Sequence, residues 1–406
     1  MEWGRAAMIK RLIFYSLFIV SLAVTCASAL PTHSSNQGIR TTLLPLIIET
    51  GPPDEFEFVE LNPLNTPRYS HTAQLLSNGQ LIFIGGNETF GVGAPTNTAE
   101  LLDPTSGVLA YTGEMNYERV GHSSTLLANG RILTAGGGVI QAEEYNPITG
   151  EFYPVGNMKK LRNEHEAVYL QSGKVLIVGG SSANIYDEVE LYDPITGSFS
   201  EVGTMNEPRN GHTSTVLRDG RVLITGGASN GISRTAEIYD PETNDFSHTG
   251  MMNENRFIHT ATLLMDGTVL ITGGSNGRNS PNDIVGSAEI YDPETGLFTT
   301  VGSLNQRRMR HTATLLPNGF VLIVGGTDRG DQLLSSVELY DPITQEFTIV
   351  GNLAHGREHF STTLLMDGTV VVAGGIINDR DGVPYPREIT TSIELIVCSA
   401  CLPPER

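Results

Sequence analysis

Histidine recurs at one place along the chain, and its imidazole is the group here best suited to metal binding or catalysis. Imidazole nitrogens bind zinc and other transition metals, but a metal needs three or four convergent ligands. Residues repeated at regular intervals are instead spread evenly over a structure and serve each repeat. The pattern therefore favours a structural role, hydrogen bonding to a neighbouring loop, and predicts no metal or other cofactor. The six histidines are His71, His122, His165, His212, His259 and His311, and the equivalent seventh residue is Phe360.

Arginine and glutamate recur with the same regularity. An arginine lies three positions before each histidine site, and a glutamate lies in a later apolar segment of each repeat. Charged groups taken out of water need partners of opposite charge, so we expect these residues to form partly buried pairs between neighbouring repeats. The two sets are Arg68, Arg119, Arg162, Arg209, Arg256, Arg308 and Arg357, and Glu100, Glu143, Glu190, Glu237, Glu289, Glu338 and Glu394.

The two positions between each arginine and its histidine site differ from repeat to repeat. Residues common to all repeats build a scaffold, whereas exposed residues that differ at equivalent positions can give a surface its specificity. We interpret these positions as a candidate binding rim, with an inert, solvated rim as the alternative. The candidate residues are Tyr69, Asn163, Glu164, Asn210, Phe257, Arg310 and His359.

Two weaker candidates lie near the C-terminus. Asp379 and Asp381 offer carboxylates to Ca²⁺, but the segment lacks the bidentate glutamate of an EF-hand, so an ordinary acidic turn is favoured. Cys398 and Cys401 form a Cys-x-x-Cys pair. In an exported protein such a pair predicts a local disulfide, whereas a redox role needs a helix N-terminus that the sequence does not indicate.

The elements that position these residues are short strands in a sevenfold repeat. Each apolar segment is four to six residues long and is bounded by Gly, Asp, Asn or Pro, which is typical of strands and tight turns. A repeat reads as four antiparallel strands, named a to d from the inside outward, and pairs such as Asp219-Gly220 predict the a–b hairpin turns. Each strand b ends in a Gly-Gly pair, at 85–86, 136–137, 179–180, 226–227, 273–274, 325–326 and 374–375.

The strand ending in Gly-Gly, the later Tyr-Asp-Pro and a period near 50 residues resemble the kelch repeat. The resemblance covers residues 56–397 and implies an all-β, seven-bladed β-propeller with four antiparallel strands per blade. Kelch strands d usually contain Trp, whereas this chain has Phe in five repeats and Leu109 in the first. The implied repeats span 68–118, 119–161, 162–208, 209–255, 256–307, 308–356 and 357–398.

The seventh repeat ends after its strand c, so its strand d must come from elsewhere. Phe58 precedes Arg68 by the same interval as Phe199 precedes Arg209. We therefore predict that residues 55–61 close the last blade. This places a propeller at 55–398, after a leader at 30–54 and before a tail at 399–406.

The first 29 residues predict export. Lys10 and Arg11 precede an apolar run of residues 12–24, which is too short for a membrane span, and an Ala-x-Ala site ends at Ala29. Cleavage there is the preferred interpretation, and a lipid anchor on Cys26 is the alternative. No later run is long enough to span a membrane, so the mature chain is expected to be soluble, in an extracellular or periplasmic location. We also expect it to be a monomer.

Charge argues against one class of partner. The 406 residues carry a formal net charge of −20, which becomes −22 once residues 1–29, with their three basic and one acidic residues, are removed. Because phosphate attraction needs a basic surface, nucleic acid is not an expected partner.

The resemblance leaves two classes of function open. Kelch-like propellers commonly present one face to proteins or glycans, and this implies a binding module that acts through the ends where strands a begin and the b–c loops open. The alternative is a carbohydrate-active enzyme, because the galactose oxidase propeller and kelch-type sialate epimerases are similar in fold. The oxidase copper site needs a Cys crosslinked to a Tyr, and Cys398 and Cys401 are the only cysteines after Cys26. No epimerase constellation is assignable, so no catalytic residue is predicted.

Overall fold

The computed structural model describes residues 56–90, 93–277, 283–328, 332–378, 387–398 and 401. Every described residue belongs to the unit Gly51–Arg406. The predicted signal peptide and leader therefore lie outside the described residues, as do Asp379 and Asp381.

The described residues form strands and turns, with seven four-stranded antiparallel sheets that we number as blades in order of their strands a. From the inside outward, blade 1 comprises β2 (Thr72–Leu75), β3 (Leu81–Ile84), β4 (Ala99–Asp103) and β5 (Val108–Tyr111). Blade 2 comprises β6 (His122–Leu126), β7 (Ile132–Gly136), β8 (Gln141–Asn146) and β9 (Glu151–Asn157). Blade 3 comprises β10 (Glu166–Tyr169), β11 (Val175–Val178), β12 (Glu188–Asp193) and β13 (Ser198–Thr204). Blade 4 comprises β14 (Thr213–Val216), β15 (Val222–Thr225), β16 (Ala236–Asp240) and β17 (Asp245–His248).

The remaining three blades follow the same order. Blade 5 comprises β18 (Thr260–Leu263), β19 (Val269–Thr272), β20 (Ser287–Asp292) and β21 (Leu297–Ser303). Blade 6 comprises β22 (Thr312–Leu315), β23 (Val321–Val324), β26 (Ser336–Asp341) and β27 (Glu346–Asn352). Blade 7 comprises β29 (Ser361–Leu364), β30 (Val370–Ala373), β33 (Ile393–Cys398) and β1 (Phe56–Glu60). Small sheets join β24 (Thr327–Asp328) to β25 (Gln332–Leu333), and β28 (Arg357–Glu358) to β31 (Ile376–Asn378) and β32 (Arg387–Ile389).

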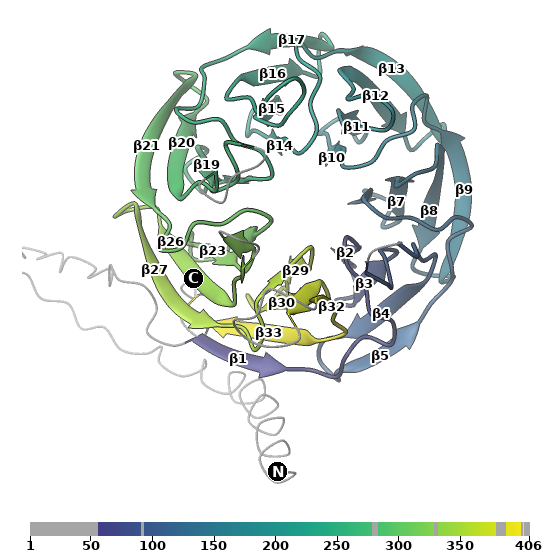
Figure 1. Ribbon diagram of the computed structural model, residues 1–406. Helices are drawn as coiled ribbons and strands as arrows, with labels where there is room; N and C mark the ends of the chain where they lie inside the picture. The colour runs from purple at the N-terminus through teal and green to yellow at the C-terminus, as the bar shows by residue number, and fades with distance from the viewer. Residues whose placement is uncertain are drawn as a thin grey trace, which may run out of the picture. The chain divides into compact units, whose positions relative to one another are not determined.

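The blades stand in a ring, with their strands a innermost (Figure 1). Each strand a contacts the strand a of the next blade, and the series returns from β29 to β2. The fold is the all-β propeller that the repeat predicts. Radial repetition of this kind leaves only short, protected strand edges.

Sequence chemistry explains the regular blades. Strands b, such as β11 and β15, are continuous β-branched and aliphatic runs, and all their residues are buried because other strands cover both faces. The a–b turns need a positive φ, which glycine adopts without steric cost. Gly220, for example, has a φ of 90°.

The phenylalanines of strands d take the packing position usual for kelch Trp. Each lies across from the tyrosine of strand c in its own blade, with ring centroids 4.7–5.0 Å apart. Aromatic pairs at this separation stabilise a sheet face. The smaller ring therefore still covers the outer part of each of these five blades.

The N-terminal strand closes the ring. β1 pairs antiparallel with β33, from Phe56 opposite Cys398 to Glu60 opposite Glu394. Phe58 also packs against blade 6, where a Cβ built on Gly351 lies 2.2 Å from the Phe58 ring. The last blade thus takes its outer strand from the beginning of the propeller sequence, so the two ends of the ring are hydrogen-bonded together.

Candidate functional site

The arginine–glutamate pairs lie within blades, which corrects the prediction of pairs between repeats. Each arginine precedes strand a and bonds the glutamate on strand c of the same blade. The N–O distances are 2.6–3.2 Å in six blades, and Arg357 pairs with Glu394 in the seventh. The pairs are fully buried rather than partly so, since no side chain in them is more than 2% exposed.

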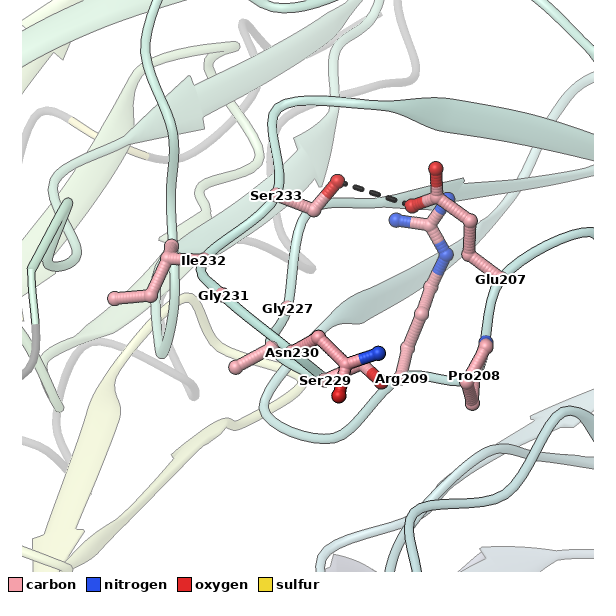
Figure 2. A pocket seen from close by; sticks show the side chains of 10 residues that line it. Glu207, Pro208, Arg209, Gly227, Ser229, Asn230, Gly231, Ile232 and Ser233 are labelled. Atoms are coloured by element: carbon pink, nitrogen blue, oxygen red, sulfur yellow. Dashed lines mark hydrogen bonds and ion pairs between the residues drawn. The ribbon is translucent and has the colours of Figure 1, made fainter.

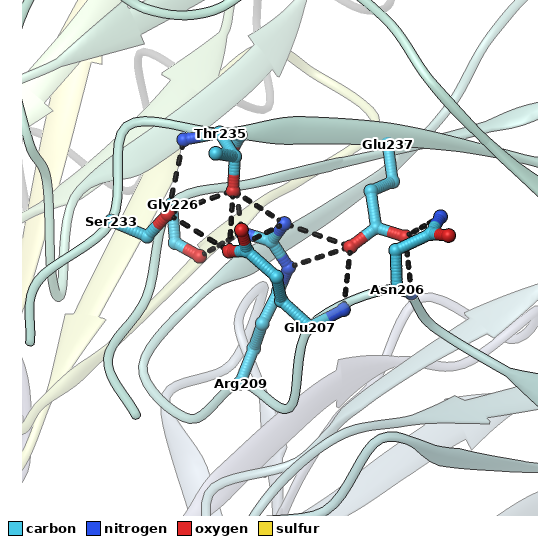
Figure 3. Close-up of polar contacts among 7 residues, drawn as sticks. All are labelled: Asn206, Glu207, Arg209, Gly226, Ser233, Thr235 and Glu237. Carbon is cyan, nitrogen blue, oxygen red and sulfur yellow. Dashed lines mark hydrogen bonds and ion pairs between the residues drawn. The ribbon is translucent and has the colours of Figure 1, made fainter. Parts of the chain in front are cut away.

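Each pair fastens the linker that arrives from the preceding blade. In blade 4, Glu237 accepts hydrogen bonds from the backbone N–H of Asn206 at 2.7 Å and from Arg209 at 2.8 Å (Figure 3). Arg209 also donates to the carbonyl of Gly226 and to the hydroxyl of Thr235. Because these groups satisfy one another, the charges tolerate burial, and the segment before strand a has a fixed path.

The two glycines that end each strand b have different partners. The carbonyl oxygen of the first glycine accepts a hydrogen bond from the arginine side chain of its own blade, at 2.6–3.2 Å. The second donates its N–H to the carbonyl of the next blade's arginine, at 2.8–2.9 Å, in all seven blades including Gly375 to Arg68. A Cβ on Gly226 meets the carbonyl oxygen of Arg256 at 2.4 Å, so this close approach between blades requires glycine.

The histidines bond hydroxyl groups on the preceding blade rather than a loop. Five of the six contact a strand-a Ser or Thr through Nε2, at 2.8–3.2 Å. Burial, followed by the neighbouring arginines, lowers the pKa of His122, His165 and His259 to about 3, so these imidazoles are neutral. Within the described part of the chain, no group of three His, Cys, Asp or Glu residues is arranged to hold a metal ion.

The residue directly before each histidine site has a left-handed backbone conformation in all seven blades. Blades 2 and 4 have Gly121 and Gly211, but five blades place other residues at φ 51–55°: Ser70, Glu164, Ile258, Arg310 and His359. A β-branched residue such as Ile258 is rare at positive φ. Such strain persists only where the surrounding structure enforces it, and it is concentrated at functional sites. Backbone hydrogen bonds between blades hold the ring, for example from Ser70 N–H to the His359 carbonyl at 2.9 Å.

These residues surround a cavity of about 710 Å³ at the end of the channel where strands a begin, which we call the channel mouth. All seven blades line it. Of the predicted rim, Tyr69, Asn163, Glu164, Arg310 and His359 line this cavity. The remaining two, Asn210 and Phe257, lie outside the lining. The Phe257 ring lies over Gly211 of the preceding blade.

One arc of the mouth carries a polar network from blades 6, 7 and 1. Buried Glu358 accepts hydrogen bonds from Arg387 at 2.8 Å, from Arg310 at 3.5 Å and from Thr327. Burial opposes ionisation of Glu358, but Arg310 and the other donors outweigh it and lower its pKa. His359 Nδ1 lies 3.0 Å from the Ser70 hydroxyl, and burial lowers its pKa to about 4. At neutral pH this arc therefore carries two arginines, one carboxylate and a neutral imidazole.

Blade 3 carries the acidic part of the mouth. Glu164 is exposed, and Glu166 lies two positions later on the wall of the same cavity. Burial raises the pKa of Glu166 to about 7. The sequence interpretation did not include Glu166. A comparison of the repeats one position after the histidine site would have found it, because the other six blades have Ser or Thr at that position.

The b–c loops open at the same end of the blades. In blade 4, residues 227–233 and the linker residues Glu207, Pro208 and Arg209 surround a smaller pocket of about 370 Å³ (Figure 2). Ser233 donates to Glu207 across it, at 3.2 Å. The pocket is open and local to one blade, whereas the mouth cavity gathers side chains from every blade.

At the C-terminus, Cys398 and Cys401 are joined by a disulfide and buried. Among the residues that the structure describes, no helix has the length and apolar character to cross a membrane.

The sequence profile of the KLHDC2/KLHL20/DRC7 Kelch-repeats domain matches residues 164–375, just over half of the chain. The chain belongs to the kelch-repeat family. Its propeller is similar to a fungal alcohol oxidase of the AA5 family solved in complex with copper, with a TM-score of 0.68 and 18% identity over 85% of this chain and 76% of that one. No curated protein matches the sequence. The kelch propeller fold is in general a protein-interaction module.

Within the described ranges, the residues of this kelch chain do not fit a copper–radical centre of the galactose oxidase type. That chemistry needs a cysteine joined to a tyrosine, but Cys398 and Cys401 are bonded to each other. Five of the six repeated histidines direct Nε2 at hydroxyl groups of the neighbouring blade. The similarity to the oxidase therefore extends to the fold and not to its donor set.

Proposed function

We propose that this kelch chain is an exported binding module that holds a protein partner at its channel mouth. The observation that carries the proposal is the ring of left-handed residues around a cavity of about 710 Å³. The backbone of the ring repeats in every blade, whereas its side chains are a hydroxyl, a carboxylate, an aliphatic group, a guanidinium and an imidazole. A rigid frame with varied side chains is how loops on a scaffold achieve specificity.

The size and charge of the mouth suit a protruding part of a partner. Ligand cavities typically span about 300–1,000 Å³, so this one accommodates one or two side chains at the tip of a loop. Arg310 lines the mouth on blade 6, and Glu164 and Glu166 line it on blade 3. A partner that carries charges of both signs therefore meets a complementary charge on each side.

Three substitutions at the mouth should abolish binding without unfolding the propeller. We expect Glu164→Gly, Arg310→Gly and His359→Gly together to weaken partner affinity by about 100-fold or more, because a few central residues dominate interface energetics. Glycine is the natural residue at this position in blades 2 and 4 and relieves the left-handed strain. Partners are sought among purified exported proteins and on a glycan array, and affinities are measured by calorimetry.

The matched control changes the opposite end of the blades. Ile148 and Ile195 lie in c–d turns and are 93% and 95% exposed, so Ile148→Ser and Ile195→Ser should leave affinity unchanged. Retained binding in the mouth variant, or loss in the control variant, contradicts the proposed site. A glycan ligand that requires the mouth residues keeps the site but replaces the protein partner.

Export has a separate test. In a host with a secretory pathway, the exported chain should begin at Leu30, as read from its intact mass, because cleavage after Ala29 follows the signal-peptide pattern. Phe18→Arg interrupts the apolar run and should keep the chain inside the cell. A lipid-modified N-terminus at Cys26 supports the anchored alternative, and an uncleaved chain in the cytosol contradicts export.

A further inference from the structure

Glu166 breaks a pattern that the other blades follow. The first residue after each histidine site lines the inside of the ring and is Thr72, Ser123, Glu166, Thr213, Thr260, Thr312 or Ser361. Five of the six hydroxyl groups bond Nε2 of the histidine on the following blade. The sixth, Thr312, is followed by Phe360, which has no nitrogen to bond.

The break leaves His212 without its usual partner. By the register of the other blades, its Nε2 is directed at the position of Glu166, which has no hydroxyl. The last residue of strand b is a second hydroxyl partner in blades 4 and 5, where Thr225 and Thr272 lie 2.9 and 3.0 Å from the next histidine. Blade 3 has Val178 there. Within the described residues, His212 is the one repeated histidine whose Nε2 and Nδ1 both lack a hydrogen bond, and it is only 3% exposed.

Both residues line the mouth cavity, as does the neighbouring Thr213. The Glu166 side chain forms no hydrogen bond or ion pair with the described part of the chain, and burial is what raises its pKa. Burial, and then Arg209, keeps His212 neutral by lowering its pKa to about 3. The cavity lining thus includes a carboxyl group and a neutral, buried imidazole, and neither side chain has a hydrogen-bond partner among the described residues.

The charges around the pair decide which ligand group suits it. Glu164, also on blade 3, adds a second carboxylate to this side of the mouth, whereas the guanidinium groups lie on blades 6 and 7. A carboxylate and a neutral imidazole both accept hydrogen bonds, and an ammonium group supplies three donors and a positive charge. Charge-assisted hydrogen bonds of this kind are stronger than neutral ones.

We propose that Glu166 and His212 form a subsite of the channel that binds the ammonium group of a lysine side chain of the partner protein. The subsite deepens the proposed function and rests on it. A lysine side chain is long and thin enough to reach from a loop at the mouth to the wall below the left-handed ring. Glu166 neutralises its charge, and the neutral imidazole of His212, which has no partner of its own, accepts a hydrogen bond from the same group.

The probe for this subsite is N-acetyl-lysine N-methylamide. Its binding to the folded chain is measured by NMR chemical-shift titration above neutral pH. We expect the lysine probe to bind at least about tenfold more tightly than its ε-N-acetyl and norleucine analogues, which lack the ammonium charge. An arginine analogue tests whether the site selects ammonium over guanidinium. Equal binding of the lysine and norleucine probes overturns the proposal.

Two variants of Glu166 complete the test. Glu166→Thr restores the residue found in four other blades and offers His212 its missing hydroxyl, so the variant should fold at least as stably as the natural chain. Both Glu166→Thr and Glu166→Gln should abolish the lysine preference, and a preference that survives in either contradicts the subsite. If the preference is absent while the three-glycine mouth variant still loses its partner, the subsite fails and the proposed function stands. If the lysine preference is present but the three-glycine mouth variant keeps its partner, the subsite stands and the proposed function fails.

Discussion

Acidification from about pH 7 to pH 5 should destabilise the propeller by on the order of 10 kcal/mol, enough to unfold a typical domain. Burial and the adjacent arginines lower the pKa of all six repeated histidines below its ordinary value of 6.5. The unfolded chain therefore binds protons that the folded chain excludes. Stability from these residues is complete above pH 6.5 and is lost as the pH falls from there toward 3.

Glu166 acts in the opposite direction. Its pKa is raised by burial to about 7, so the folded state holds this proton more tightly than the unfolded chain does. Protonation of Glu166 therefore stabilises the fold as the pH falls from 7 toward its ordinary value of 4.5. One carboxyl group opposes six imidazoles, each contributing about 1.4 kcal/mol per pH unit, so the net effect of acid is destabilising.

Urea unfolding at a series of pH values, followed by far-UV circular dichroism, measures this loss. The control variant is His212→Phe, because Phe360 occupies the equivalent site in blade 7 and because His212 has no hydrogen bond to lose. The variant should take up about one proton fewer on unfolding at pH 5 than the natural chain. A stability that does not change between about pH 7 and 5 contradicts neutral burial of the ring.

Deleting residues 56–60 should destabilise the propeller by about 5 kcal/mol or more. The deletion removes the five-residue pairing of β1 with β33 and uncovers the edge of blade 7. It also removes Phe56 and Phe58, which pack against the core cluster of blades 6 and 7. Each ladder hydrogen bond contributes about 1 kcal/mol and each of the two partly buried rings on the order of 1 kcal/mol, so these losses together approach the stability of a whole domain.

Thermal unfolding of the deleted chain measures the effect, and two controls separate closure from simple truncation. Phe58→Ala should reproduce part of the loss, whereas Glu57→Ala, at an exposed position of the same strand, should have little effect. A synthetic peptide of residues 52–62 should restore stability when added to the deleted chain. A deleted chain that unfolds at the same temperature as the full chain shows that β1 does not close the ring.

Much of the scaffold was predictable because each blade repeats the same local chemistry. Paired glycines after β-branched runs, Asp-Gly turns and the displaced Phe58 predict strands, hairpins and closure from neighbouring residues alone. Two contacts were misjudged because they depend on how blades stand against one another. Arg68 bonds Glu100 of its own blade rather than a residue of a neighbouring repeat, and His71 bonds the Ser361 hydroxyl of the preceding blade rather than a loop.

In the candidate site, too, some positions were predictable from the repeat and others were not. The position of Glu164, Arg310 and His359 at the channel mouth followed from comparing repeats, since equivalent residues in a ring face the same axis. Phe257 is at the same repeat position as Asn163 and Tyr69 but does not line the cavity. Gly211 has no side chain, so the Phe257 ring packs over it on the neighbouring blade.

The sequence by itself determined the architecture of this protein: the repeat, its strands and turns, and the strand that closes the last blade. These features rest on residues close together along the chain, where spacing and side-chain type decide the structure. Only the tertiary structure revealed the left-handed ring, the full burial of the ion pairs and the placement of Glu166 and an unpartnered His212 in the lining of one cavity. Those features depend on residues from different blades, and ring closure alone brings them to one cavity.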